Sequence, residues 1–264
     1  MCGTCGCSDN NNGTLISFPK KHDHHHHHGH HHQHHHNGHD HSHDPKQRII
    51  NLEQDILSFN QIGAARNRGY FEAKDIYAVN LVSSPGSGKT TLLERTLKDL
   101  KSETDFYVVE GDQRTTNDAN RIDALNVPVI QINTGQGCHL ESDMVYDAVK
   151  QLEVKNDSVL MIENVGNLVC PAMFDLGENC RVVIISVTEG DDKPIKYPDM
   201  FHSANLCIIN KIDLLPYVDF DLEKAKEYSR RVNNNIDFVE VSATKGDGMK
   251  MWYQWLQDAR IKVK

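Results

Sequence analysis

The chain of 264 residues carries 28 lysines and arginines against 37 acidic residues, so its formal net charge is −9 with histidine counted as neutral. This acidic balance argues against a nucleic-acid partner. No apolar run approaches the roughly 18 residues that a membrane-spanning helix requires, and the N-terminus lacks the apolar segment of a secretory signal. We therefore expect a cytoplasmic protein that contacts neither nucleic acid nor membrane.

The first 45 residues have the composition of a tail. They consist mainly of Gly, Asn, Asp, Ser and His, and only Leu15, Ile16 and Phe18 have large apolar side chains. Such a segment cannot bury enough apolar surface to offset the entropy lost when it becomes ordered. We predict that residues 1–45 are disordered without metal. Residues 46–264 are predicted to form one domain, because their number suffices for a sizeable core.

Two groups of metal-ligand residues lie in this tail. Cys2, Cys5 and Cys7 can converge as three thiolates, with the terminal amine available as a fourth ligand, in a square-planar Ni(II) site or a tetrahedral Zn(II) site. Between His22 and His43, 15 of 22 residues are histidine, with irregular interruptions that argue against an engineered purification tag. Because imidazole suits nickel, we predict a nickel buffer with many ligands, including His24, His25, His26, His27, His28, His30, His31, His32, His34, His35 and His36.

The body alternates short apolar runs with helical patterns, beginning with an amphipathic helix predicted over Gln47–Arg68. Strands are predicted over Ile76–Ser83, Phe106–Glu110, Val129–Ile132, Val159–Ile162, Val182–Val187, Leu206–Ile209 and Phe238–Val241. Helices are predicted over Thr91–Lys101, Asn117–Leu125, Asp143–Leu152, Leu222–Val232 and Met249–Ala259. This alternation of Val/Ile/Leu-rich strands with helices indicates an α/β fold with a doubly wound, mainly parallel sheet. Such sheets bind ligands at the carboxyl ends of their strands.

A phosphate-binding loop follows the first predicted body strand and opens the next helix. Its glycines allow backbone N–H groups to approach phosphate oxygens, Lys89 reaches the β- and γ-phosphates, and the Thr90 hydroxyl can ligate Mg²⁺. Ser83 stands where the motif has its first glycine, which is a mild departure at a position that needs a small residue. The predicted phosphate contacts are Ser84, Pro85, Gly86, Ser87, Gly88, Lys89, Thr90 and Thr91.

Two later strand ends predict that the nucleotide is GTP. In Asn210-Lys211-Ile212-Asp213 the aspartate can accept both N1–H and the exocyclic amine of guanine, which adenine does not offer together. Ser242-Ala243-Thr244-Lys245 ends the last strand, where a third guanine-contacting loop would lie. Alone, the first motif is more often a solvated strand end. After a phosphate loop it predicts guanine binding by Asn210, Lys211, Asp213, Ser242 and Ala243.

Carboxylates for Mg²⁺ binding and GTP hydrolysis are expected at two further strand ends. Asp112 is the candidate to contact Mg²⁺ directly or through water, with Asp118 as the alternative. Glu163 fits the second strand end, and the backbone N–H of Gly166 can sense the γ-phosphate; Glu110 and Glu163 could instead simply end their strands. The GTPase reaction is thus assigned to Lys89, Asp112 and Glu163, and Mg²⁺ to Thr90, Asp112 and Glu163.

A second metal site is predicted in the body. Cys138 and His139 follow a glycine-rich loop after one strand, and Cys170 lies on the loop that leaves another strand. Both loops should lie at the nucleotide edge of the sheet. Two thiolates and an imidazole suit Ni²⁺ or Zn²⁺, and water or a second subunit would have to complete the shell. A buried cysteine and an exposed histidine without metal are the alternative; Cys180 and Cys207 are predicted core residues.

With these residues in view, the chain resembles the hydrogenase nickel-incorporation GTPases, the HypB family, over essentially its whole length. The resemblance is carried by Cys2-Gly3-Thr4-Cys5-Gly6-Cys7, the histidine tract, Ser84–Leu92, Glu110-Gly111-Asp112-Gln113, Gly137-Cys138-His139-Leu140, Glu163-Asn164-Val165-Gly166-Asn167-Leu168-Val169-Cys170-Pro171 and Asn210–Asp213. The strings around Cys138 and Cys170 are specific to this family, whereas the phosphate loop is shared by many.

The resemblance implies a GTPase that dimerises when GTP is bound and supplies Ni²⁺ for assembly of the [NiFe]-hydrogenase active site. It implies that Cys138, His139 and Cys170 bind Ni²⁺ or Zn²⁺ at the dimer interface and that Cys2, Cys5 and Cys7 form a tight nickel site. The implied partners are a small zinc-containing hydrogenase maturation protein, a nickel metallochaperone and, indirectly, the hydrogenase large subunit. The implied cofactors and cargo are GTP, Mg²⁺, Ni²⁺ and Zn²⁺.

Two other functions compete with this interpretation. The related GTPases of urease maturation share the fold and often a histidine-rich N-terminus, but the string Glu163–Pro171 and the cysteine motif favour the hydrogenase family. A nickel storage or detoxification protein is the second alternative, because 15 imidazoles exceed what a carrier of one ion needs.

Overall fold

The computed structural model describes residues 15–17, 45–112, 117–135 and 137–263. Within these residues one sheet has the strand order β1-β4-β3-β5-β2-β6-β7-β8, in which β1 is antiparallel to β4 and every other pair is parallel. The strands are β1 (Leu15–Ser17), β2 (Tyr77–Ser83), β3 (Phe106–Asp112), β4 (Val129–Asn133), β5 (Val159–Glu163), β6 (Cys180–Ser186), β7 (Leu206–Asn210) and β8 (Asp237–Val241).

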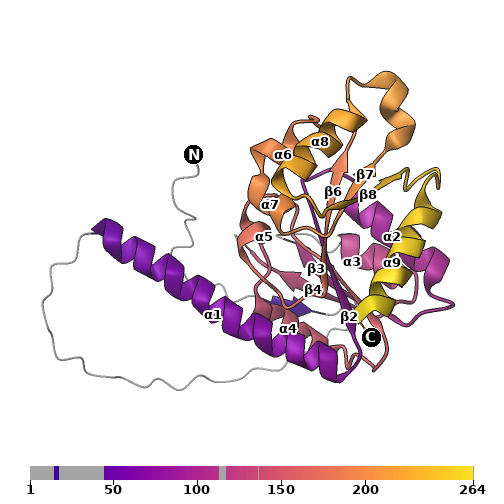
Figure 1. Ribbon diagram of the computed structural model, residues 1–264. Helices are drawn as coiled ribbons and strands as arrows, with labels where there is room; N and C mark the ends of the chain where they lie inside the picture. Colours follow the sequence, from indigo (N-terminus) through magenta and orange to yellow (C-terminus); the bar gives the residue numbers. More distant parts are fainter. Residues whose placement is uncertain (1–14, 18–44, 113–116, 136, 264) are drawn as a thin grey trace, which may run out of the picture.

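Helices cover both faces of this sheet (Figure 1). They are α1 (Pro45–Ala73), α2 (Lys89–Leu100), α3 (Asn117–Asp123), α4 (Ser142–Gln151), α5 (Cys170–Met173), α6 (Lys193–Lys196), α7 (Pro198–His202), α8 (Leu222–Val232) and α9 (Met249–Val263), with the 3₁₀ helix η1 (Ile212–Tyr217). Apolar side chains of α2, α3 and α9 pack on one face. Those of α1 and α4 pack on the other face, followed along the sheet by those of α7 and α8.

The predicted α/β fold is confirmed, and each predicted body strand and helix is present with ends shifted by a few residues. The central strands are recognisable because both of their faces are buried; every residue of β2 and β6 is buried. Helix α2 shows the complementary pattern, because Leu92, Leu93 and Leu97 are at most 1% exposed on its inner face.

Four short helical elements and β1 were not predicted. Helices α5, α6 and α7 have four or five residues each, too few to show a helical repeat of apolar positions. Strand β1 lies within the segment predicted to be disordered without metal and pairs Leu15–Ser17 with β4. Its residues include two of the three large apolar residues of that segment. The predictions for Cys2, Cys5, Cys7 and the histidine tract lie outside the described residues.

The order of the strands creates the ligand-binding edge. Strand β2 lies between β5 and β6, so the chain connections after β2 and after β5 leave on opposite sides. A crevice forms at the carboxyl ends of strands where connections diverge in this way. The loops that follow β2, β3, β5 and β7 meet there and bring together residues from distant parts of the sequence. No helix among the described residues is long and apolar enough to cross a membrane.

Candidate nucleotide and metal site

A hollow of about 450 Å³ lies over the carboxyl ends of β2, β3 and β5. It is lined by the phosphate loop from Ser83 to Thr91, by Glu110, Gly111, Asp112, Asp118 and Arg121, and by Gly166 and Lys211. Gly88 precedes α2 with φ of 92°, and a Cβ there would lie 2.5 Å from Nδ2 of Asn210. Only glycine meets both demands, because L-residues avoid this φ and the neighbouring loop occupies the side-chain position.

Glu163 holds together the two phosphate-loop side chains expected to act on the nucleotide. Its Oε1 accepts hydrogen bonds from Lys89 Nζ at 2.8 Å and from the Thr90 hydroxyl at 2.6 Å. The Glu163 side chain is fully buried, and Lys89 is 11% exposed. Within the described part of the chain Oε2 of Glu163 and Oγ of Ser87 have no partner. Buried polar oxygens are normally hydrogen-bonded or bound to a cation. The Thr90 hydroxyl and the unpaired Glu163 oxygen are oxygen ligands of the kind that Mg²⁺ prefers.

Glu110 is a second buried carboxyl at this edge, in register with Glu163 on the neighbouring strand. Its side chain is 2% exposed and Oε2 has no partner among the described residues. Burial, followed by the charge of Glu163, raises the pKa of Glu110 from 4.5 to about 9. Glu110 is therefore neutral at pH 7. The alternative that it merely ends its strand leaves this buried, unpaired oxygen unexplained.

The two candidates for a switch aspartate both line the hollow. Asp112 ends β3, and its backbone carbonyl accepts a hydrogen bond from Thr134 N–H at 2.9 Å. Asp118 lies in the first turn of α3, where its carboxylate forms an ion pair with Arg121 at 3.1 Å. Arg121 also pairs with Glu94 and donates to the Thr91 hydroxyl at 3.3 Å. The loop that joins them lies outside the described residues.

The two loops predicted to bind guanine are tied to the phosphate loop through Asn210. Its Nδ2 donates to the carbonyl of Ser87 at 2.9 Å, and its Oδ1 accepts from the backbone N–H groups of Lys211 and Ala243. Lys211 Nζ also donates to the carbonyl of Gly86 at 2.7 Å. Asn210 thus holds both loops beside the phosphate loop. Asp213 is the second residue of the 3₁₀ helix η1, which follows directly after Lys211.

Cys138, His139 and Cys170 come together as predicted. One ligand atom from each lies within 4.8 Å of the other two, and no second group of this kind occurs among the described residues. The Cys138 and Cys170 sulfurs form a disulfide with Cα atoms 6.1 Å apart, a state not predicted from sequence. Cysteine binds metal as its thiolate, so this disulfide must be reduced before the two sulfurs can bind an ion. Cys170 is 7% exposed and His139 9%.

Neighbouring side chains hold His139 in place. Its ring stacks on Phe174, with centroids 3.7 Å apart and planes at 22°. Nδ1 lies 3.7 Å from Sγ of Cys138, while Nε2 is 3.7 Å from a carboxylate oxygen of Glu141 and has no hydrogen-bond partner in the described chain. Packing therefore orients the imidazole so that Nδ1 lies beside the Cys138 sulfur, and Nε2 remains without a hydrogen bond in the described chain.

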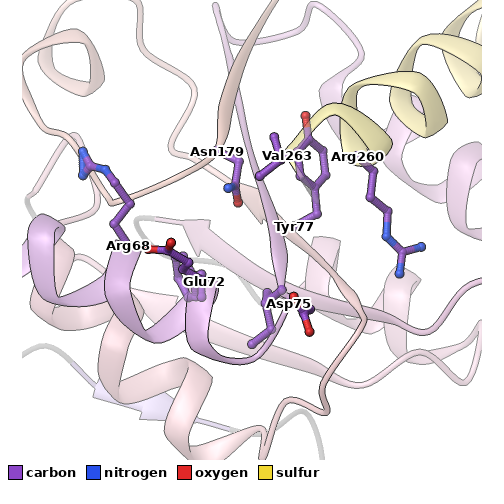
Figure 2. Close-up of a pocket in the computed structure, with 9 residues that line it drawn as sticks. Arg68, Glu72, Asp75, Tyr77, Asn179, Arg260 and Val263 are labelled. Atoms are coloured by element: carbon purple, nitrogen blue, oxygen red, sulfur yellow. The ribbon is translucent and has the colours of Figure 1, made fainter.

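A different hollow, at the opposite end of the sheet, lacks comparable chemistry (Figure 2). It lies between the end of α1, the start of β2 and α9, and has a volume of about 350 Å³. Its arginines are already paired, Arg68 with Asp175 at 2.6 Å and Arg260 with Asp157 at 2.7 Å. Cys180 and Cys207 are buried in the core as predicted, and burial raises the pKa of the Cys180 thiol to about 12.

Sequence patterns missed several residues of this region. Glu189, in the loop after β6, accepts a hydrogen bond from the Ser84 hydroxyl and one from the backbone N–H of Ser186. Phe174 supports the imidazole, and Asn164 contacts both the metal and nucleotide loops. The position of Asn164 directly after a strand-end glutamate was the one available signal. Each of the three residues has at least one partner far away in the sequence, so spacing could not show these contacts.

Comparisons with known proteins agree with this geometry. Residues 77–240 match the family model described as CobW/HypB/UreG, nucleotide-binding domain. The hydrogenase maturation factor HypB of Azotobacter chroococcum mcd 1 is 55% identical over 215 residues, which are 81% of this chain and 70% of that protein.

Two solved structures are similar throughout the body. The hydrogenase maturation factor HypB of Archaeoglobus fulgidus has a TM-score of 0.72 and 38% identity, over 77% of this chain and 99% of that one. HypB of Helicobacter pylori, solved in complex with nickel, has a TM-score of 0.74 and 37% identity, over 77% of this chain and 95% of that one. The phosphate loop, the strand-end carboxylates and these similarities lead to one conclusion. The chain belongs to the HypB family of hydrogenase maturation factors and carries its nucleotide-binding domain.

Proposed function

We propose that this protein is a GTP-hydrolysing nickel metallochaperone that delivers Ni²⁺, under GTP control, for maturation of [NiFe]-hydrogenase. One observation carries the proposal: the segment from Glu163 to Cys170 takes part in both sites. Glu163 contacts Lys89 and Thr90, Gly166 lines the phosphate hollow, and Cys170 meets Cys138. A few residues therefore separate a group that senses the γ-phosphate from a ligand of the cargo metal.

Residues at the hollow have the chemistry that GTP hydrolysis needs. Lys89 and the backbone N–H groups of the loop would bind the phosphates, and the α2 N-terminus favours their negative charge. Thr90 and Glu163, with Asp112 or Asp118, would hold Mg²⁺, which neutralises charge that develops on the phosphate oxygens. Asp213, together with the loop of Ala243, would select guanine. The described lining residues include no glutamine that could position the water for attack on the γ-phosphate, so slow hydrolysis is expected.

Nickel is the cargo in this proposal, bound by the reduced thiols of Cys138 and Cys170 and by His139. Soft thiolates and imidazole suit Ni²⁺, and they also suit Zn²⁺ as a competing ion. Three ligands leave the shell incomplete. A second copy of the chain would complete it, and a GTP-dependent homodimer would make metal binding respond to nucleotide. Cys2, Cys5 and Cys7 would form a separate, tighter nickel site.

The proposed partners are those of the maturation pathway: a small zinc-containing hydrogenase maturation protein, a nickel metallochaperone and, indirectly, the hydrogenase large subunit. The H. pylori relative solved with nickel supports nickel as the cargo. Nickel buffering by the histidine tract is proposed as an additional activity, because its 15 imidazoles exceed the need of a single-ion carrier. Service to urease maturation is the alternative pathway.

The test is a Ni²⁺ titration of the full-length, reduced chain with Cys2, Cys5 and Cys7 replaced by serine. Absorbance from thiolate-to-nickel charge transfer then reports on Cys138 and Cys170, because histidine has no thiolate. We expect the dissociation constant and the oligomeric state to differ between GDP and a non-hydrolysable GTP analogue, and Cys170→Ala to abolish the charge-transfer signal. Equal nickel affinity in both nucleotide states would show that GTP acts through partner docking instead.

A further inference from the structure

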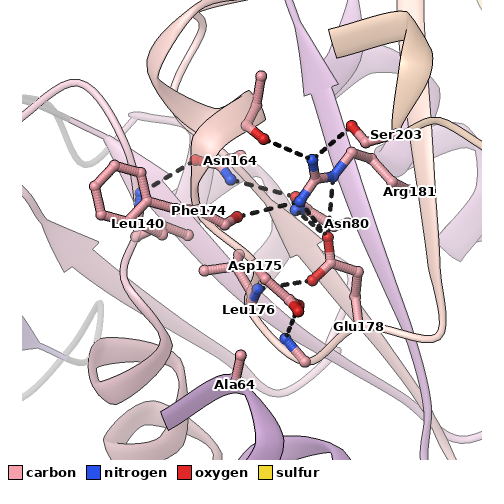
Figure 3. Close-up of polar contacts among 12 residues, drawn as sticks. Ala64, Asn80, Leu140, Asn164, Phe174, Asp175, Leu176, Glu178, Arg181 and Ser203 are labelled. Carbon is pink, nitrogen blue, oxygen red and sulfur yellow. Dashed lines mark hydrogen bonds and ion pairs between the residues drawn. The ribbon is translucent and has the colours of Figure 1, made fainter. Parts of the chain in front are cut away.

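Hydrogen bonds and an ion pair join the buried side chains of Asn164, Asn80, Glu178 and Arg181 (Figure 3). Asn164 follows Glu163 and is fully buried. Its Oδ1 accepts hydrogen bonds from two backbone N–H groups, Leu140 at 3.3 Å and Val165 at 2.9 Å. Leu140 directly follows His139, and Val165 directly precedes Gly166. A single oxygen is therefore shared by the loop that carries two metal ligands and the loop that faces the phosphates.

The other end of Asn164 is anchored in the core. Its Nδ2 donates to Oδ1 of Asn80 at 3.3 Å, and Asn80 Nδ2 donates to Glu178 at 3.0 Å. Asn80 lies on β2, the strand that leads into the phosphate loop, and is fully buried. Burial acts to raise the pKa of Glu178, but the charge of Arg181 at 2.8 Å and the hydrogen bond from Asn80 hold this pKa below its ordinary value. The nitrogen end of the Asn164 amide is therefore anchored in the core, whereas its oxygen is bound to the backbone of the two loops.

Arg181 extends this network toward Cys170, the third predicted metal ligand. Its guanidinium donates to the carbonyls of Phe174 at 3.1 Å and Ala172 at 3.3 Å. Phe174 is the residue that stacks on His139, and Ala172 lies in α5, the helix that begins with Cys170. The side chains of Glu178 and Arg181 are only 6% and 7% exposed. His139 is thus next to Leu140 and stacked on Phe174, while Cys138 and Cys170 each lie two residues from a backbone group that this network holds.

The arrangement is more than the fold alone requires. Buried amides and ion pairs lose hydration, and apolar side chains of similar volume often give equal or greater stability. A network with every partner in place does fix relative positions. Leu140 transmits such positioning because it is fully buried and packs on Gly111 of β3, where an added Cβ would lie 2.9 Å from its side chain. Movement of its N–H group must shift neighbouring His139.

We propose that Asn164 is a positioning residue that couples the nucleotide-facing loop to the metal ligands. The proposal rests on the nickel-delivery function above and names the side chain through which it operates. When Val165 and Gly166 move toward a γ-phosphate, the shared oxygen moves with Val165 and changes its hydrogen bond to Leu140. His139 and the thiol of Cys138 then change position relative to Cys170. Nickel affinity follows the nucleotide through this one bond.

The test compares Asn164→Ala with its parent in the serine-substituted full-length chain described above. In the parent, exchanging GDP for the GTP analogue is expected to change the nickel dissociation constant by a factor in the range of about 5–150, the usual size of an allosteric coupling. In Asn164→Ala this factor should fall to near one while the affinity in the GDP state stays close to that of the parent. A side chain that only stabilises the fold would weaken nickel binding equally in both states.

Asn179→Ala is the matched control. Its Oδ1 also accepts one backbone hydrogen bond, from Ala78 at 2.7 Å, but at the start of β2, away from both sites. It should keep the parent's coupling factor. Parent coupling that persists in Asn164→Ala overturns the inference and leaves the proposed function intact. Absence of coupling in the parent overturns the inference together with the nucleotide-dependent nickel affinity that the proposed function includes.

Hydrogen exchange in the parent provides a measurement that does not depend on the folding of any variant. In reduced, metal-free protein the GTP analogue should change exchange in a peptide that contains Leu140, relative to GDP, together with the peptide that contains Val165. A change confined to the Val165 peptide would overturn the inference, because the shared hydrogen bond would then transmit nothing.

Discussion

At the scale of single residues, the buried carboxylate of Glu163 is the clearest candidate for a functional group. Its Oε1 accepts from both Lys89 and Thr90, and the whole side chain is inaccessible to solvent. A buried carboxylate must be paired or must coordinate a cation, and the second oxygen has no partner in the described chain. The strand-end position predicted a functional glutamate; the direct contact with both phosphate-loop side chains is visible only in the structure.

Glu163→Gln should therefore reduce GTP hydrolysis strongly while nucleotide binding persists. We expect a decrease of about 100-fold or more, the scale of losing one positioned electrostatic group, because an amide is a weaker ligand for Mg²⁺ and a weaker partner for Lys89. Phosphate release under single-turnover conditions measures it. Glu223→Gln, at a 78%-exposed surface glutamate, is the control and should hydrolyse GTP normally. Unchanged hydrolysis in Glu163→Gln would remove Glu163 from the reaction.

Glu110 gives a prediction for pH. Its pKa is about 9 in the folded protein against 4.5 ordinarily, so between these values the folded state keeps a proton that the unfolded state has lost. Stability from this group is complete below pH 4.5 and is lost as pH rises through 9. Glu110→Gln, which stays neutral, should lose this dependence. Between about pH 6 and 8 we expect its unfolding free energy to fall less than that of wild type, by about 2–3 kcal/mol.

Urea unfolding without nucleotide or metal, in the presence of a chelator, measures this difference. The tail histidines titrate in both proteins, so their contribution cancels in the comparison. Parallel pH profiles for wild type and Glu110→Gln would mean that the Glu110 carboxyl ionises in the folded protein like an exposed one.

At the scale of elements, the loop after β5 depends on a glycine. A Cβ on Gly166 would lie 3.3 Å from Cα of Pro85 in the phosphate loop. Both residues line the phosphate hollow, so the backbone of one loop packs directly on that of the other. The proposed contact between the Gly166 N–H and a γ-phosphate requires this close approach, and the start of α5, with Cys170, lies at the same edge of the sheet.

Gly166→Ala should therefore weaken binding of a GTP analogue more than binding of GDP. The added methyl group forces the two loops apart, which affects the γ-phosphate side of the hollow first. We expect about a tenfold selective loss, equal to about 1.4 kcal/mol, in equilibrium binding measurements. Gly69→Ala in α1 is the contrast, because nothing lies within 4 Å of its Cβ position. It should leave binding unchanged and stabilise the helix by about 0.5–1 kcal/mol. Equal losses for both nucleotides would separate Gly166 from γ-phosphate sensing.

At the scale of the whole molecule, the proposal divides nickel handling between tail and body. Replacing His24–His36 histidines with asparagine should impair hydrogenase maturation at low nickel and leave it normal when nickel is abundant, because a buffer matters only when the ion is scarce. Cys170→Ala should impair maturation at both nickel levels, because it removes a delivery ligand. Hydrogenase activity in cells grown over a nickel series measures both. Equal defects for the two variants at high nickel would contradict this division.

The sequence alone determined the α/β class and the phosphate loop, and it predicted that Cys138, His139 and Cys170 lie together. Strands buried on both faces show as continuous Val/Ile/Leu runs, as in β6, and a phosphate loop needs specific residue types at fixed spacing. Cys138-His139 and Cys170 were predicted at the same edge because parallel strands share their carboxyl ends.

Only the tertiary structure decided what depends on contacts between distant residues. Short elements such as α5 carry too few residues for a repeat to appear, and β1 exists through its pairing with β4. The pKa of Glu110 reflects its burial beside Glu163, and the role inferred for Asn164 depends on Leu140, 24 residues away, and Asn80, 84 residues away. Spacing along the chain cannot encode such pairs, because folding brings their partners together from separate strands and loops.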